Sequence, residues 1–231
     1  MDTMKNRLQV VKSRIDAACA ASDGYARDIV LVAISKGHTD AALRAAYDAG
    51  QRDFGESYVQ EALDKMAALT DLPICWHFVG PIQRNKTRAI AEHFDWVHSL
   101  DRLKVAERLS AQRPADMPPL NVCVQVNVSG ETSKSGVAPV DVVELARAVA
   151  ALPRLRLRGL MAIPEPTQDC DLTHRRFALL AQLRDTLRQE GVSLDTLSMG
   201  MSDDFEIAIA AGSTMVRVGT AIFGARAART A

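Results

Sequence analysis

A lysine at the end of a predicted buried strand is the first residue whose chemistry stands out. Residues 29–34 form a continuous apolar run rich in β-branched side chains, which is typical of a parallel strand buried on both faces. Lys36 follows at the carboxyl end of this strand, where parallel α/β folds place their functional groups. A partly desolvated lysine favours its neutral form, and a neutral amine condenses with aldehydes and ketones. The alternative is a lysine that marks where the strand meets water.

Arg217, in the last predicted strand, is the second such residue. Alternation places Met215, Arg217 and Gly219 on one face of this strand. An arginine that faces the axis of a barrel would be costly without an anion or a ring acceptor opposite it. In pyridoxal 5'-phosphate (PLP) proteins, an aspartate or an arginine commonly meets the cofactor's ring nitrogen. The alternatives are an ion pair with Glu56 or Asp203, or an outward orientation.

Two loops rich in glycine and hydroxyl residues could bind an anion. They are residues 198–204 and 219–224, which follow the seventh and eighth predicted strands. Barrels often bind phosphate with these loops, because small residues let backbone N–H groups approach and a helix N-terminus adds positive partial charge. A phosphate site is therefore predicted there. The alternative is two turns that need Gly and Ser only for backbone geometry.

Polar side chains on two other strands admit both a structural and a ligand-binding role. Gln125 and Asn127 share one face of the predicted strand 120–128, either as satisfied core amides or as ligand contacts. His77, between two aromatic residues, is predicted to be a packed, hydrogen-bonded core histidine rather than a general base. Neither strand identifies a ligand by itself.

The elements that position these residues recur as a strand followed by a helix. The predicted strands are 29–34, 53–56, 74–79, 96–100, 120–128, 155–163, 196–199 and 215–219. The predicted helices between them are 41–49, 58–69, 85–93, 101–109, 139–149, 173–190 and 203–211. About eight such units indicate an α/β fold of the (β/α)8 TIM-barrel type, with a doubly wound open sheet as the alternative.

A single domain is expected over residues 1–231. Apolar residues recur at helical spacing near the start of the chain and predict an extra N-terminal helix over about residues 1–21. This helix is expected to cover one end of a barrel that spans about residues 28–224. No apolar stripe stays unexplained after the helices are assigned, so a monomer is expected.

The composition excludes several classes of partner. The 28 basic and 28 acidic side chains cancel, so the net charge attracts neither nucleic acid nor an anionic membrane. A run of about 18 apolar residues is absent, as is an apolar stretch near the start. We therefore predict no transmembrane helix and no signal peptide, and a cytoplasmic protein. The four cysteines fall in no metal-ligand spacing, which predicts free thiols and no metal site.

Several strings of the sequence resemble the pyridoxal phosphate homeostasis protein family. They run in order from Lys36 to Gly224, nearly the whole chain, and the longer ones are highly specific. The strings are 35–36 (SK), 54–61 (FGESYVQE), 76–86 (WHFVGPIQRNK), 124–127 (VQVN), 133–136 (SKSG), 158–161 (RGLM), 197–204 (LSMGMSDD) and 217–224 (RVGTAIFG).

The resemblance implies a PLP-binding barrel related to the N-terminal domain of alanine racemase. It implies PLP held as a Schiff base on Lys36, with Arg217 facing the pyridine nitrogen. Further candidate contacts are Asn127 and Ser57; the family usually has asparagine at position 57, so only the part of an amide contact that a hydroxyl can make is expected there. The segments that hold the phosphate in that family contain here Ser198, Gly200, Ser202, Gly219 and Thr220.

These inferences predict a carrier of PLP rather than an enzyme. A Schiff base needs a lysine, an anion site and a ring pocket, whereas a racemase also needs a second acid/base, which alanine racemase takes from a further domain. Because the chain ends soon after its last predicted strand, no such domain is expected. The predicted role is vitamin B6 homeostasis, in which PLP passes to apo PLP enzymes. Whether Lys134 also receives PLP stays open.

Two other functions remain as alternatives. One is a small PLP-dependent amino-acid racemase. The other is an aldolase-type barrel that forms its Schiff base with a phosphorylated sugar and no cofactor, a reaction that has no need of Arg217.

Overall fold

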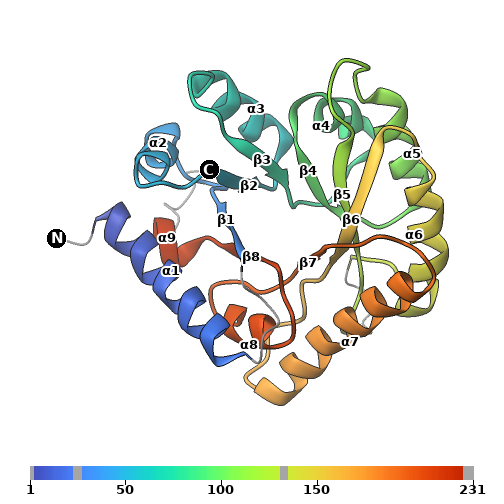
Figure 1. Cartoon of the computed structure of the whole chain (residues 1–231). Helices are drawn as coiled ribbons and strands as arrows, with labels where there is room; N and C mark the ends of the chain where they lie inside the picture. The colour runs from blue at the N-terminus through green and yellow to red at the C-terminus, as the bar shows by residue number, and fades with distance from the viewer. Residues whose placement is uncertain (1–2, 23–27, 131–134, 226–231) are drawn as a thin grey trace.

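The computed structural model describes residues 3–22, 28–130 and 135–225, which form a closed barrel of eight parallel strands (Figure 1). The strands pair in chain order, and the last pairs with the first to close the ring. They are β1 (Val30–Ile34), β2 (Asp53–Glu56), β3 (Cys75–Phe78), β4 (Trp96–Leu100), β5 (Leu120–Gln125), β6 (Leu155–Met161), β7 (Thr196–Ser198) and β8 (Met215–Val218). The TIM-barrel prediction is confirmed, and the open-sheet alternative is wrong.

Helices connect the strands and form a ring outside the barrel (Figure 1). They are α2 (Asp40–Asp48), α3 (Val59–Ala68), α4 (Thr87–His93), α5 (Leu103–Gln112), α6 (Val142–Ala150), α7 (Cys170–Gln189), α8 (Phe205–Ala210) and α9 (Thr220–Phe223). Two 3-10 turns, η1 (Arg84–Lys86) and η2 (Pro139–Asp141), precede α4 and α6. Within the described ranges, no helix combines the length and the apolar character needed to cross a bilayer.

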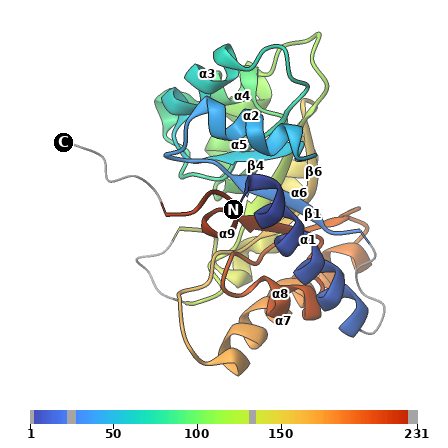
Figure 2. The same ribbon diagram turned by 90° about the vertical axis from the view of Figure 1, so that its left-hand side faces the viewer.

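The N-terminal helix α1 (Met4–Ala21) lies in this outer ring, not across an end of the barrel (Figures 1 and 2). It packs against α2, α8 and α9. Its buried residues are Leu8, Val11 and Ile15, and the neighbouring α9 has only four residues. The prediction of the helix is confirmed, whereas its expected place over one end of the barrel differs from the observed one.

Side chains of β1 fill the barrel interior next to β2. Val32 and Ile34 point toward Gly55, where an added Cβ atom would lie 2.5 Å from Ile34 Cδ1 and 3.1 Å from Val32 Cγ1. Large branched side chains of this kind form the packed layers inside such barrels. The strand therefore alternates, with Val32 and Ile34 directed inward.

Two helix starts differ from the predicted ones because of their caps. Helix α7 begins three residues earlier than predicted, since the Asp169 side chain caps it by accepting from the Leu172 N–H at 2.9 Å. Asp101, expected to open α5, does not cap it. Arg102 holds the N-cap position of α5 without a side-chain hydrogen bond.

Candidate functional site

The pairing of β1 with β8 brings the Lys36 segment and the predicted phosphate segment together. Val32 pairs with Arg217 in this parallel register. Two residues further along each strand, a Cβ atom on Gly219 would lie 3.3 Å from the Ile34 carbonyl oxygen. Lys36, which is half-buried, follows at the same carboxyl end of the barrel. The two segments are thus neighbours in space although about 180 residues separate them in sequence.

A ring contact holds the same two segments from the outside. His38 follows Lys36 by two residues, and its ring stacks on Phe223 of α9 with centroids 4.9 Å apart and an interplanar angle of 25°. Offset stacking of this kind fixes both the distance and the orientation of the two rings. The loop that carries Lys36 is therefore fastened to the helix that follows β8.

A buried ionic cluster fixes the backbone on both sides of Lys36. We call Ser35, Glu56, Glu61 and Lys65 the anchor cluster. Lys65 Nζ donates to the Ser35 carbonyl oxygen at 2.7 Å and to Oε1 of both glutamates at 2.6 Å. The Ser35 hydroxyl donates to Glu56 Oε1 at 2.7 Å, and the Gly37 N–H donates to Glu61. With both neighbours of Lys36 held, its side chain leaves the strand end in one direction.

Burial raises the pKa of the Glu56 carboxyl, against the opposing effect of the Lys65 ammonium. The Glu56 side chain is fully buried and that of Lys65 is 7% exposed, so the pair depends on mutual neutralisation. Sequence reasoning missed Lys65. Its spacing of four residues from Glu61 on α3 was the available signal, and that spacing predicts only a surface pair.

Arg217 points into the barrel and is almost completely buried, at 3% exposure. Its guanidinium donates to the Ser198 carbonyl at 2.7 Å, to the Ser198 hydroxyl at 2.6 Å and to the Ala162 carbonyl at 2.8 Å. Among the described residues it forms no ion pair, so the alternatives of a Glu56 or Asp203 partner and of an outward orientation are wrong. The guanidinium has five N–H groups and makes three hydrogen bonds here, so two N–H groups stay available to a ligand.

Burial lowers the pKa of Arg217 to about 10, against the opposing effect of Asp204. The guanidinium therefore keeps its charge at neutral pH. A buried cation surrounded by carbonyl oxygens needs a further acceptor, and a ring nitrogen can supply one.

The Ser198 hydroxyl lies in the barrel interior. This group accepts from Arg217 and lies 2.7 Å from Nδ1 of His98, a residue on β4. Ser198 and His98 are both fully buried. The structure thus brings the Ser198 hydroxyl together with Arg217 and not with Gly219 or Thr220. Sequence reasoning missed His98, whose signal was its place on the same face of its strand as Trp96.

The two glycines of the predicted phosphate loops occupy tight backbone positions. Gly200 has φ +96°, and a Cβ atom there would lie 2.7 Å from the Ala208 Cβ atom of α8. Gly219 holds the N-cap position of α9, and its carbonyl accepts from the N–H groups of Ile222 and Phe223 at 2.9 Å each. The first N–H groups of a helix have no acceptor within it, which here leaves those of Thr220 and Ala221.

The remaining candidates are placed by a turn, a cleft and a loop. Asn127 accepts from the Gly130 N–H at 3.1 Å through its side chain, and its own N–H donates to the Val137 carbonyl at 2.9 Å. Ser57 lines a separate cleft of about 270 Å³ together with Lys86. Ser202 is half-buried on the loop after β7. Lys134 lies outside the described residues.

The family model of the alanine racemase N-terminal domain matches residues 3–227, so the fold and the site define a barrel of this class. A pyridoxal phosphate homeostasis protein of Pseudomonas aeruginosa is 60% identical over 226 residues, which are 98% of this chain and 97% of that protein. A pyridoxal phosphate homeostasis protein of Escherichia coli is 51% identical over 232 residues, 98% of each chain. The chain therefore belongs to the pyridoxal phosphate homeostasis protein family.

Solved structures share the fold. PipY of Synechococcus elongatus, solved with PLP bound, is 38% identical and superposes with a TM-score of 0.85, covering 96% of this chain and 100% of PipY. An alanine racemase of Clostridium difficile is 12% identical with a TM-score of 0.75, covering 94% of this chain and 57% of the racemase. The second likeness shows the barrel alone and carries nothing about activity.

Proposed function

We propose that this protein binds PLP covalently through Lys36 and serves as an intracellular carrier in PLP homeostasis. The observation that carries the proposal is the close approach of the ends of β1 and β8, where a Cβ atom on Gly219 would lie 3.3 Å from the Ile34 carbonyl oxygen. Lys36 follows Ile34 in the chain, α9 follows Gly219, and Arg217 on β8 has donors to spare. Relatives with 60% and 51% identity are named pyridoxal phosphate homeostasis proteins, and PipY has been solved with PLP bound.

The residues present fit the cofactor's three functional parts. Lys36 would take the aldehyde, and Arg217 would donate to the ring nitrogen with one of its two spare N–H groups. Backbone donors around Gly200, Ser202, Gly219 and Thr220 would hold the phosphate, aided by the tight approach that each glycine permits. We leave the Ser198 hydroxyl out of this set, because His98 and Arg217 already occupy it.

Bound PLP supplies an aldehyde that an amine can capture and a ring that can withdraw electrons. Lys36 would hold the cofactor through its neutral amine, the group that condenses with an aldehyde with loss of water. The anchor cluster keeps the backbone of Lys36 in place for this addition. Arg217 is a cation that only donates, so it keeps the ring nitrogen unprotonated and the ring a weak electron sink. This arrangement suits storage of the cofactor better than turnover of an amino acid.

The proposal includes release of PLP to apo PLP enzymes, as a monomer in the cytoplasm. The four cysteines, Cys19, Cys75, Cys123 and Cys170, are free thiols, which supports a reducing compartment. Asn127 and Ser57 enter the proposal as secondary contacts of the cofactor.

Reduction with borohydride followed by peptide mass analysis tests the attachment. The protein is incubated with PLP, reduced and digested, and we expect the pyridoxyl label on the peptide that contains Lys36. Lys36→Arg should abolish the label and the yellow colour, and Lys104→Arg, an exposed site on α5, should change neither. Label on another amine such as Lys134 in the wild-type protein would contradict the assignment.

A further inference from the structure

A line of hydrogen bonds crosses the barrel interior from Arg217 to the opposite end. Arg217 Nη1 lies 2.6 Å from Ser198 Oγ, and Ser198 Oγ lies 2.7 Å from His98 Nδ1. His98 Nε2 lies 2.9 Å from His77 Nδ1, and His77 Nε2 lies 3.0 Å from Asp53 Oδ1. We call these five residues the interior chain. They come from β8, β7, β4, β3 and β2, so the closed barrel alone brings them into line.

Buried side chains lie between the two charged ends of the interior chain, Arg217 and Asp53. Ser198, His98 and His77 are fully buried, and Arg217 is 3% exposed. Only the Asp53 side chain, at 29% exposure, reaches the surface. Asp53 begins β2, so it lies at the amino end of the barrel, across from Lys36. A cation next to the proposed ring site is therefore linked to a carboxylate on the far side.

The two ends fix the direction of every hydrogen bond between them. A guanidinium only donates and a carboxylate only accepts, so Ser198 must accept from Arg217 and His77 Nε2 must donate to Asp53. With neutral rings, His98 Nε2 then donates to His77, and the Ser198 hydroxyl donates to His98 Nδ1. Burial lowers the pKa of His98 well below its usual value, and His77 and Arg217 lower it further, so the His98 ring is neutral.

The opposite direction would leave a buried donor without an acceptor. If His77 were a cation, its Nδ1–H would donate to His98, and His98 would donate to Ser198. The Ser198 hydroxyl would then receive two donors, and its own proton would have no acceptor among the described residues. An unsatisfied buried hydroxyl is expensive. Both imidazoles therefore carry their proton on Nε2.

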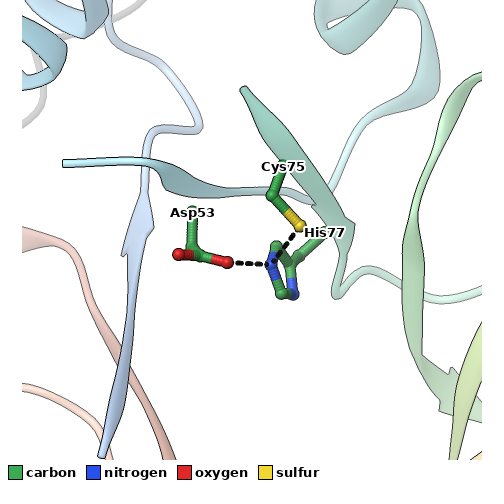
Figure 3. Close-up of side chains that lie close together, drawn as sticks. All are labelled: Asp53, Cys75 and His77. Atoms are coloured by element: carbon green, nitrogen blue, oxygen red, sulfur yellow. Dashed lines mark hydrogen bonds and ion pairs between the residues drawn. The ribbon is translucent and has the colours of Figure 1, made fainter. Parts of the chain in front are cut away.

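Cys75 lies beside the end of the interior chain, where three side chains bring possible metal-ligand atoms together. Figure 3 shows Asp53, Cys75 and His77 together, with Cys75 Sγ 3.4 Å from His77 Nε2, and their ligand atoms lie within 4.8 Å of one another. A metal bound there would have to displace the proton on His77 Nε2 that the interior chain requires. Burial and the Asp53 carboxylate raise the pKa of the Cys75 thiol, which stays protonated.

We propose that the interior chain positions Arg217 for the cofactor and carries the influence of the Asp53 carboxylate through two neutral imidazoles to its guanidinium. Aligned hydrogen bonds polarise one another, so a change at Asp53 alters the strength with which Arg217 donates to its ligand. The last step of this inference rests on the proposed function, because it takes the ligand of Arg217 to be the ring nitrogen of PLP. Asp53, His77 and His98 are then positioning residues that never touch the cofactor.

Histidine NMR tests the direction of the chain without any cofactor. In protein labelled with nitrogen-15 in histidine, long-range proton–nitrogen spectra distinguish the two neutral tautomers and the cation. We expect His77 and His98 as neutral Nε2–H tautomers at pH 7, with the His77 Nε2–H resonance shifted in Asp53→Asn and unchanged in Asp71→Asn, whose carboxylate pairs with Arg44 on the surface. An Nδ1–H tautomer or a cation at either ring would overturn the proposal.

PLP retention tests the consequence at Arg217. We expect Asp53→Asn to release PLP about fivefold faster than wild type, with a shifted visible band, and Asp71→Asn to match wild type. Ser198→Ala interrupts the interior chain, so Asp53→Asn should have no further effect in that background. Additive effects of the two substitutions, or an Asp53→Asn protein with wild-type release and colour, would overturn the coupling. Wild-type protein that retains no PLP would instead overturn the proposed function, and the NMR result would still decide the direction of the chain.

Discussion

Gly219 at the end of β8 lies against Ile34 at the end of β1, so close that a Cβ atom on the glycine would come within 3.3 Å of the Ile34 carbonyl oxygen and 3.4 Å of the Ile34 Cβ atom. Lys36 is two residues beyond Ile34, and α9 begins one residue beyond Gly219. This single close approach therefore sets the distance between the proposed attachment point of PLP and the proposed phosphate donors.

Gly219→Ala should weaken PLP retention with little loss of stability. The backbone of Gly219 has φ −114°, which alanine adopts without strain, so the methyl group acts by pushing the two strand ends apart by a few tenths of an ångström. We expect PLP release to be about fivefold faster and the free energy of unfolding to change by less than about 1 kcal/mol. Stopped-flow release and urea unfolding measure the two quantities.

Gly212→Ala is the matched control for this substitution. Gly212 has φ +94° and no heavy atom within 4 Å of an added Cβ, so alanine there is strained but touches nothing. Its free energy of unfolding should fall by about 1 kcal/mol, with PLP release unchanged. Equal rates of PLP release in the two variants would show that the contact between Gly219 and Ile34 does not determine how the site holds PLP.

Lys65→Met should destabilise the protein strongly, because it leaves the Glu56 carboxyl buried without its cation. The expected loss is about 3 kcal/mol in free energy of unfolding at pH 7. The double variant Lys65→Met with Glu56→Gln should regain part of this stability. The control Lys104→Met, on the exposed side of α5, should have nearly the free energy of unfolding of the wild type. A Lys65→Met protein as stable as wild type would mean that the anchor cluster does not hold the Lys36 segment.

The pH dependence of Lys65→Met has a definite sign. Burial already raises the pKa of Glu56, and removal of Lys65 removes the largest opposing effect. In the window between the usual value of 4.5 and the raised folded value, the folded state binds the proton more tightly than the unfolded state. The stability of the variant relative to wild type should therefore rise as the pH falls from 7 to 5. Urea titrations at the two pH values measure this difference.

His98 should make the protein lose stability in mild acid. It faces His77, Ser198 and Arg217 in a site that holds it neutral, and its pKa is lowered well below 6.5. The unfolded state takes up a proton as the pH falls below about 6.5 and the folded state does not, so stability is fully present above this pH and is lost below it. Between pH 7.5 and 5.5 the expected loss from this group is about 1.4 kcal/mol.

A comparison of variants isolates that contribution from the other titrating groups. His98→Gln should lack this part of the acid loss, whereas His93→Gln, an exposed histidine on α4, should keep it. The difference between the two slopes of unfolding free energy against pH is the quantity to measure. Parallel slopes would contradict a neutral buried His98.

The sequence was sufficient for the strands and for the positions of the two residues on which the proposed site depends. A continuous apolar run predicts a buried strand, and alternation along it predicts the face, which is how Lys36 and Arg217 could be placed. Both patterns can be recognised from residues that are neighbours in the chain. The same holds for the start of α2, which is predicted at residue 41 and begins at Asp40, with Thr39 as its cap.

The parts that could not be predicted depend on barrel closure. His98 meets Ser198 across the interior although 100 residues separate them, and no local pattern specifies this pair. Ser198 is the last residue of β7, and a strand end cannot be located to one residue from the sequence, although one residue decides whether a side chain faces the interior. The place of α1 against α2, α8 and α9 likewise depends on helices that only the closed ring brings together.

Alanine should keep its α-hydrogen when it is incubated with the PLP-loaded protein. Arg217 is a buried cation with three acceptors already in place, so it meets the ring nitrogen as a donor and does not supply the proton that would make the ring a strong electron sink. Loss of deuterium from α-deuterated L- or D-alanine should therefore be no faster than with free PLP at the same concentration, as followed by proton NMR. Exchange of both enantiomers at a turnover rate would establish a racemase and end the carrier proposal. The borohydride label on Lys36 would be the same for a carrier and for a racemase, so only the exchange rate separates the two functions.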